Sequence, residues 1–152
     1  MLNELAKLLP QNPRSFREAI TSAEEILSQS PQVHLDVVHH FSKGIYARQI
    51  FMPKGMMITG KVHKTEHLCI MNGDIDIADD DGNFRYTGYH VFNSRPGIKR
   101  ILATHEDTFF TTIHVTDETD IEKLEKSLVA ENYEEYEQQL LISCREVLPW
   151  VL

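Results

Sequence analysis

The sequence predicts a mainly β protein, an antiparallel sandwich or barrel with a helical segment at each end. Short runs of β-type residues recur about every ten residues between positions 33 and 116, with no helical pattern between them. Before and after this stretch, apolar residues recur at spacings of three and four, as in helices. We therefore divide the chain into an N-terminal helical segment (1–32), a β-barrel (33–116) and an acidic C-terminal helical segment (117–152).

The length and composition are those of one soluble globular domain. The 152 residues can bury a sizeable core, and no apolar run approaches the roughly 20 residues of a membrane span. The N-terminus lacks the basic start and apolar core of a secretory signal. Cys69 and Cys144 form neither a disulfide framework nor a metal-type pair, which favours a reducing compartment or a virus particle. We expect a cytoplasmic or virion location and no membrane partner.

The net charge of −8 is concentrated at the C-terminal end. Residues 117–152 contain ten acidic and three basic side chains, so this segment carries −7 by itself. An acidic segment argues against nucleic-acid binding, which needs clustered lysine and arginine. We interpret it as the solvated face of a helix rather than as an acidic docking surface.

Capping signals place the first helix between two proline-containing pairs. Asn12-Pro13 predicts the start, with Asn12 as the N-cap and Pro13 at the first helical position. Ser30-Pro31 predicts the end, because the residue before a proline disfavours the helical conformation. The apolar residues at helical spacing are Phe16, Ala19, Ile20, Ala23, Ile26 and Leu27.

Turn signals divide the central stretch into eight or nine short strands. Asn72-Gly73 is the strongest of these signals, because this pair is typical of tight hairpins. The acidic residues 79–81 are interpreted as part of a turn and not as a calcium loop, since such a loop would need glutamate where His90 stands. The expected β-type runs are 33–38, 45–51, 56–63, 68–71, 74–78, 84–86, 89–93, 99–104 and 108–116.

Helical periodicity returns after Thr116. Thr119 or Asp120 can cap a helix whose apolar stripe is Ile121, Leu124 and Leu128. A second amphipathic helix follows. Its apolar side chains are Tyr133, Tyr136, Leu140, Cys144 and Val147.

The stretch 55–73 is the densest in chemically active side chains, with Lys61, His63, Glu66 and His67 inside seven residues. It resembles the first motif of the cupin family of double-stranded β-helix barrels. That motif is a glycine, five residues, His-x-His, a glutamate and a closing glycine. Counted from the first glycine, Lys61 stands at the first histidine position and His63 at the second. His67 stands at the glutamate position.

Residues 96–104 are similar to the second cupin motif, with Arg100 at the histidine position and Thr104 at the asparagine position. Over roughly residues 39–126 the chain more closely resembles cupin-like proteins encoded by tailed bacteriophages and prophages. This resemblance implies a jelly-roll barrel and a phage-type protein in the host cytoplasm or the virion. The segments that carry it are 44–48, 60–67, 95–97 and 111–114.

In metal-binding cupins, three histidines and a glutamate hold one divalent ion, and this chain keeps part of that set. Only His63 and His67 of the inherited positions are competent ligands, because arginine keeps its proton and lysine would need a large pKa drop. Two imidazoles hold a transition metal weakly, so a third ligand is needed. Its candidates are His105, His114 and Glu66. The predicted metal ligands are His63, His67 and His114, and the candidate cofactor is a divalent transition metal.

A small anion is the other ligand that these positions can recognise. Two basic side chains and two histidines would converge in the barrel mouth, and buried positive charge is costly unless it is paired. Arginine offers bidentate geometry to a carboxylate or phosphate. A histidine there can act as the acid–base group, since imidazole titrates near neutral pH. The ligand-binding residues are then Lys61, Arg100, Tyr46 and Arg48, and the catalytic residues are His63 and His67.

Strand alternation and composition give the remaining expectations. His67 and Cys69 share one strand face, and Phe110, Thr112 and His114 share another. Cys69 is expected to be a buried apolar thiol, because no basic neighbour activates it. The methionines at 52, 56, 57 and 71 are expected to fill the core.

Three functions fit the sequence. The first is a ligand-binding or enzymatic cupin. The second is a non-catalytic phage protein, virion-associated or acting on a host component, that uses the barrel as a scaffold. The third is an oligomerisation module with terminal helices between subunits, which makes a homo-oligomer the expected assembly. A salt-bridged core of no function is the alternative to a pocket, with Glu66, Glu106 and Asp107 as internal partners of the basic residues.

Overall fold

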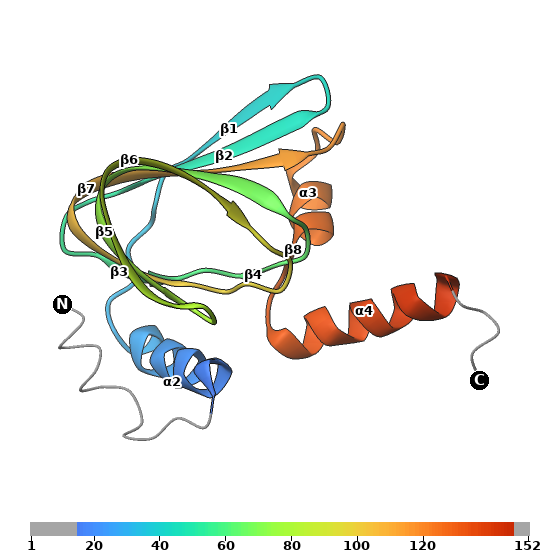
Figure 1. The fold of residues 1–152 in the computed structure, drawn as a ribbon, viewed down its shortest axis with the longest axis horizontal. Coiled ribbons are helices and arrows are strands. Elements are labelled where there is room, and N and C mark those ends of the chain that lie inside the picture. The colour runs from blue at the N-terminus through green and yellow to red at the C-terminus, as the bar shows by residue number, and fades with distance from the viewer. Residues whose placement is uncertain (1–14, 148–152) are drawn as a thin grey trace.

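The computed structural model describes residues 15–147 and consists of a β-rich body with helices beside it (Figure 1). The described helices are α2 (Phe16–Ser28), α3 (Ile121–Leu128) and α4 (Tyr133–Val147). The strands are β1 (Val37–Ser42), β2 (Ile45–Met52), β3 (Met57–Thr59), β4 (Val62–His63), β5 (His67–Asp79), β6 (Gly82–Ser94), β7 (Ile101–Val115) and β8 (Val129–Ala130).

The main sheet has the strand order β1-β2-β7-β5-β6, and β3 pairs with β7 beyond the end of β2. A second, two-stranded sheet joins β4 to β8. Every pair in the described part of the chain is antiparallel. The predicted fold class, mainly β and antiparallel, is therefore confirmed.

The strands β5, β6 and β7 are long, and β5 and β7 change register near their middle. The β5–β7 pairing shifts twice between Asn72 and Ile75. Gly73 has a φ of +155°, and a Cβ atom there would lie 2.2 Å from Thr108 Oγ1. The bulge therefore needs a residue without a side chain. The predicted hairpin turn at Asn72-Gly73 is wrong, because this glycine serves a bulge within one continuous strand.

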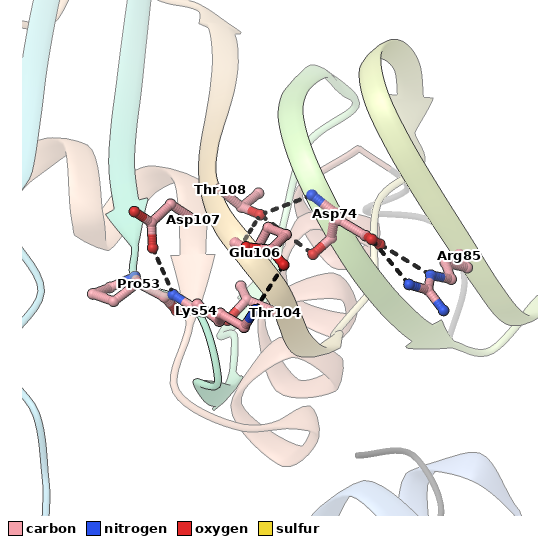
Figure 2. A network of polar contacts seen from close by, with 8 residues as sticks. All are labelled: Pro53, Lys54, Asp74, Arg85, Thr104, Glu106, Asp107 and Thr108. Atoms are coloured by element: carbon pink, nitrogen blue, oxygen red, sulfur yellow. Dashed lines mark hydrogen bonds and ion pairs between the residues drawn. The ribbon is translucent and has the colours of Figure 1, made fainter.

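Polar contacts hold the region around the bulge (Figure 2). The Thr108 hydroxyl accepts a hydrogen bond from the Asp74 backbone N–H at 3.2 Å and donates one to the Glu106 carbonyl at 2.9 Å. The Asp74 carboxylate accepts two hydrogen bonds from the Arg85 guanidinium, at 3.0 and 2.9 Å. Lys54 Nζ lies 2.7 Å from Glu106 Oε1. These contacts tie β5, β6 and β7 to the segment that follows β2.

The main core lies on the inner face of the curved sheet. Met52 and Met71 are fully buried there, as predicted for the methionines at these positions. Cys69 is also fully buried, which confirms the predicted burial of this thiol, and burial raises its pKa to about 11. The buried core side chains are Ile50, Met52, Cys69, Met71, Ile75, Ile77, Leu102 and Phe110.

Several strand limits differ from the sequence prediction. The expected runs 68–71 and 74–78 form the single strand β5, and 99–104 joins 108–116 in β7, because the chain continues through the bulge without reversing. The expected run 56–63 is divided into β3 and β4. The division follows from pairing, since β3 bonds to β7 whereas β4 bonds to β8. The run expected from 33 begins as a strand only at Val37.

Helix α2 begins later than predicted. Its N-cap is Ser15, whose side chain accepts a hydrogen bond from the Glu18 backbone N–H, and the predicted cap Asn12 lies outside the described residues. The helix packs Ile20 and Ala23 against the barrel. Lys99 Nζ, almost wholly buried, lies 2.6 Å from Glu24 Oε1 and fixes the helix to the segment before β7.

The C-terminal helices contact the other end of the sheet. Asp120 caps α3, as predicted, by accepting a hydrogen bond from the Lys123 backbone N–H at 3.0 Å. Leu124 and Leu128 are buried against Tyr46 of β2. The second half of α4 extends from the body, as Figure 1 shows, with Leu140, Leu141 and Ile142 exposed. None of the helices within residues 15–147 is both long enough and apolar enough to cross a membrane.

Replacing Gly73 with alanine should lower the free energy of unfolding by about 3 kcal/mol, because a positive φ strains the backbone and the new methyl group overlaps Thr108. Gly88 is a matched control, since it faces Gly73 in the β5–β6 register and has a φ of +84° with no atom within 4 Å of an added Cβ. Gly88→Ala should cost only about 1 kcal/mol. Urea denaturation measures both values, and equal losses would contradict the steric role of Gly73.

Candidate metal centre

Three histidines from separate strands meet at one end of the barrel interior. His63 ends β4, His67 begins β5, and His114 lies near the end of β7. One nitrogen from each ring can be chosen so that the three atoms lie within 4.8 Å of one another. The ring centroids are 4.3 Å apart for His63 and His67 and 4.6 Å apart for His67 and His114. The predicted set is therefore brought together.

Strand alternation explains how two of these rings meet. His67 and Cys69 point inward from β5, and Thr112 and His114 point inward from β7. Cys69 pairs directly with Thr112, so the two histidines lie beside each other one step further along the sheet. His63 is held by its own backbone N–H, which donates to the Ile98 carbonyl at 3.1 Å.

Each ring has a buried nitrogen without a hydrogen-bond partner. These atoms are Nδ1 of His63, Nε2 of His67 and Nδ1 of His114. The opposite nitrogens of two rings are occupied: His67 Nδ1 donates to the Thr65 carbonyl at 2.9 Å, and His114 Nε2 contacts Thr112 Oγ1 at 3.0 Å. A ring that donates from one nitrogen presents a lone pair at the other, as metal-ligating histidines do.

The three imidazoles are neutral near pH 7. Burial lowers the pKa of His63 to about 2 and that of His114 to about 4, and the neighbouring histidines act in the same direction. Burial also lowers the pKa of His67. Neutral imidazole is the form that binds a metal. The site therefore fits the predicted role of these histidines as metal ligands, and the acid–base role of His63 and His67 stays a prediction.

These residues fit a divalent transition metal. Imidazole suits zinc, copper, iron and nickel, whereas magnesium and calcium prefer oxygen ligands. Three protein ligands are the usual number at centres that leave a coordination position open. Within residues 15–147, no carboxylate or thiol joins the three histidines. Of the candidates for a third ligand, His114 is the one that joins the other two histidines, since His105 pairs instead with Asp76 at 2.6 Å.

A cavity of about 700 Å³ lies beside this centre, and His63 and His114 line it. One wall comes from residues 30–35, which connect α2 to β1. The opposite wall is the inner sheet face. Apolar side chains supply much of the lining, among them Val33, Leu35, Ile50, Ile58, Leu102 and Phe110.

The predicted cationic cluster forms only in part. Arg100 lies near the histidines, but it bonds to Asp79 Oδ2 at 3.2 Å and Ser94 Oγ at 2.9 Å. Lys61 lines the cavity with its ammonium group 2.7 Å from Glu131 Oε1, where both side chains are exposed. These two charges are therefore balanced inside the chain. The predicted internal partners, Glu66, Glu106 and Asp107, are therefore wrong for these two residues. The actual partners, Glu131 and Asp79, lie 70 and 21 residues away along the chain, so the sequence alone did not reveal them.

Arg48 and Tyr46 both line the cavity, as predicted for this face of β2. Within the described part of the chain, Arg48 forms no hydrogen bond or ion pair. Its positive charge contributes to the lowered pKa values of His63 and His114. Tyr46 is buried, its ring stacks on His114, and its hydroxyl lies 2.7 Å from His39 Nδ1. Among the basic residues that line the cavity, Arg48 is thus the one without a partner in the described part of the chain.

No protein-family model matches the chain, and no curated protein matches it. Solved structures do resemble it. A protein from Photorhabdus luminescens has 16% identity and a TM-score of 0.48, with 62% of this chain and 86% of that one covered. A cupin domain from Bordetella pertussis has 9% identity and a TM-score of 0.44, with 57% and 98% covered.

A further similar structure is an RmlC-like cupin with a double-stranded β-helix fold from Methanocaldococcus jannaschii. Its identity is 13% and its TM-score 0.45, with 60% of this chain and 85% of that one covered. The solved neighbours thus include cupin proteins, the family that the motifs of this chain resemble.

Metal-free protein should lose stability as the pH falls below about 6.5. In the unfolded chain each histidine takes up a proton near 6.5, whereas in the folded protein His63 and His114 do so only near 2 and 4. The unfolded state therefore binds more protons in this window, and each group lowers the free energy of unfolding by at most about 1.4 kcal/mol per pH unit.

Urea denaturation of chelator-treated protein at several pH values measures this loss. His114→Gln removes one of the titrating groups and should flatten the dependence. An unchanged free energy of unfolding between about pH 7.5 and 5 would contradict the buried, neutral state of the histidines.

Proposed function

We propose that this protein binds a divalent transition metal through His63, His67 and His114 and receives a small anionic molecule in the adjoining cavity. The observation that carries the proposal is the group of three histidines, each with a buried ring nitrogen without a partner, and each able to offer one nitrogen to a set of atoms within 4.8 Å of one another. An unpartnered buried polar atom costs free energy, and a shared metal ion satisfies all three at once.

The charge balance of the site supports an anionic ligand. Three neutral imidazoles leave the double positive charge of a bound ion uncompensated. Arg48 adds a further cation at the cavity wall that no described residue pairs. Charge of one sign in a half-enclosed cavity attracts a ligand of the opposite sign. Apolar walls around it favour a molecule with a carboxylate or phosphate at one end and a hydrocarbon body.

If the site is catalytic, the bound metal would take part in the chemistry. A bound metal of this type supplies a Lewis acid that polarises a ligand oxygen. The described residues would bind and orient the ligand, with Arg48 holding its anionic end and the apolar wall excluding water. The phage-type origin and the cytoplasmic or virion location stay predictions of the sequence resemblance.

Protein purified without a histidine tag should contain close to one equivalent of zinc, iron, nickel, copper or manganese per chain, measured by plasma mass spectrometry. His67→Ala and His114→Ala should each remove most of the metal, because two imidazoles hold a transition metal weakly. His90→Ala is the matched control, since the His90 ring bonds to the Thr87 carbonyl and packs against Tyr86, and it lies outside the cluster.

Two results would contradict the metal proposal. One is metal-free protein that also fails to take up added zinc or nickel. The other is equal metal content in the His90, His67 and His114 variants.

Short-chain carboxylates and inorganic phosphate should raise the melting temperature of the metal-loaded protein in proportion to their binding. Arg48→Ala should remove at least half of this rise, because it deletes the unpaired cation. Lys61→Ala should leave the rise unchanged, since Lys61 is already paired with Glu131. Differential scanning fluorimetry gives these values, and equal rises in the two variants would argue against anion binding at Arg48.

A further inference from the structure

Most of the lysine, arginine and glutamate side chains that line the cavity are paired inside the chain. Among the described residues, the ion pairs are Glu24 with Lys99 at 2.6 Å, Lys61 with Glu131 at 2.7 Å and Arg100 with Asp79 at 3.2 Å. The exceptions are Arg48 and Glu125. Neither side chain has a hydrogen bond or an ion pair within residues 15–147. The cavity therefore keeps one unpaired charge of each sign.

The fold brings these two charges to the same part of the cavity wall. Arg48 belongs to β2 and Glu125 to α3, and Tyr46 connects the two elements. Tyr46 lies two residues before Arg48 on the inner face of β2, and Leu124, the residue before Glu125, packs against it. Both charges act on the Tyr46 hydroxyl: burial raises its pKa, the charge of Arg48 lowers it, and the charge of Glu125 raises it.

The two charges do not satisfy each other. No ion pair joins Arg48 to Glu125 in the described part of the chain, and both side chains are exposed, so water solvates them in the free protein. A ligand with only a carboxylate would bring a second negative charge near Glu125, and like charges repel. An ammonium group on the same ligand would turn this repulsion into attraction.

We propose that the ligand of this cavity is a small zwitterion, such as an amino acid, whose carboxylate binds Arg48 and whose ammonium group binds Glu125. The inference rests on the proposed function, because it takes the anion site at Arg48 as one half of the recognition. Glu125 supplies the other half and determines specificity. It selects molecules with both charges from among small anions, and it disfavours the plain carboxylic acids of the same shape.

The apolar part of the cavity limits the rest of this ligand. The walls near the two charges include Leu124 and Leu128 of α3, with Val37 and Ile50 from the first two strands. A hydrocarbon body can pack on these side chains while its charged end reaches Arg48 and Glu125. We therefore expect an apolar zwitterion rather than a strongly polar one.

Isothermal titration calorimetry of the full chain tests the proposal with two pairs of probes. In each pair the second molecule lacks only the amino group of the first. The pairs are L-leucine with isocaproate and ε-aminocaproate with caproate. The two zwitterions are isomers that differ in the separation of their charged groups, so the test does not depend on one spacing.

In at least one pair, the zwitterion should bind about three- to fivefold more tightly than the plain acid, which is the size of an exposed ion pair. Glu125→Gln should remove this preference, because glutamine keeps the shape of the side chain without its charge. Glu122→Gln is the matched control. Glu122 is also an exposed glutamate of α3, but it pairs with Lys126 and does not line the cavity. This variant should keep the preference.

A preference lost in Glu125→Gln and kept in Glu122→Gln supports the proposal. Three results would overturn it: equal binding within both pairs, a preference that survives Glu125→Gln, and a preference that both variants lose. The second would show that the amino group binds elsewhere, for example to a bound metal. If neither caproate nor isocaproate binds, the anion site of the proposed function fails and this inference fails with it. Binding of both acids without any preference overturns this inference alone.

Discussion

The close approach of β5 and β7 at Gly73 and Thr108 is the contact on which this structure depends. It lets long strands pass through a bulge without losing their partners, so β5 and β7 line both halves of the core. The inner face that buries Cys69 and Phe110 in the core ends in His67 and His114. The candidate metal centre is thus the polar end of the same side-chain rows that form the hydrophobic core.

The charges inside the barrel divide into balanced and unbalanced groups. Arg100 is balanced by Asp79, and Lys99 by Glu24, as burial of a charge requires. The three histidines avoid the cost of burial by staying neutral. Arg48 keeps its charge unbalanced at the cavity wall. A site with three neutral histidines and one unpaired arginine is suited to binding an anion from outside the chain.

The sequence predicts the parts of this structure that depend on local periodicity. Alternation correctly placed His67 beside Cys69, and the cap signal at Asp120 was correct, because both depend on neighbouring residues. It could not predict the partners of Arg100, since Asp79 lies 21 residues away and is joined to it only by the fold. The Asn72-Gly73 signal failed for a related reason. A glycine allows a turn and a bulge equally, and only the close approach of Thr108 distinguishes them.

The connection between α2 and β1 forms a cavity wall, although residues 30–35 take no part in the hydrogen-bonded sheet. Loops outside a sheet tolerate changes in length at small free-energy cost. A change in the length of this connection alone would therefore alter the size and shape of the cavity, while the bulge, the core and the histidines stay as they are.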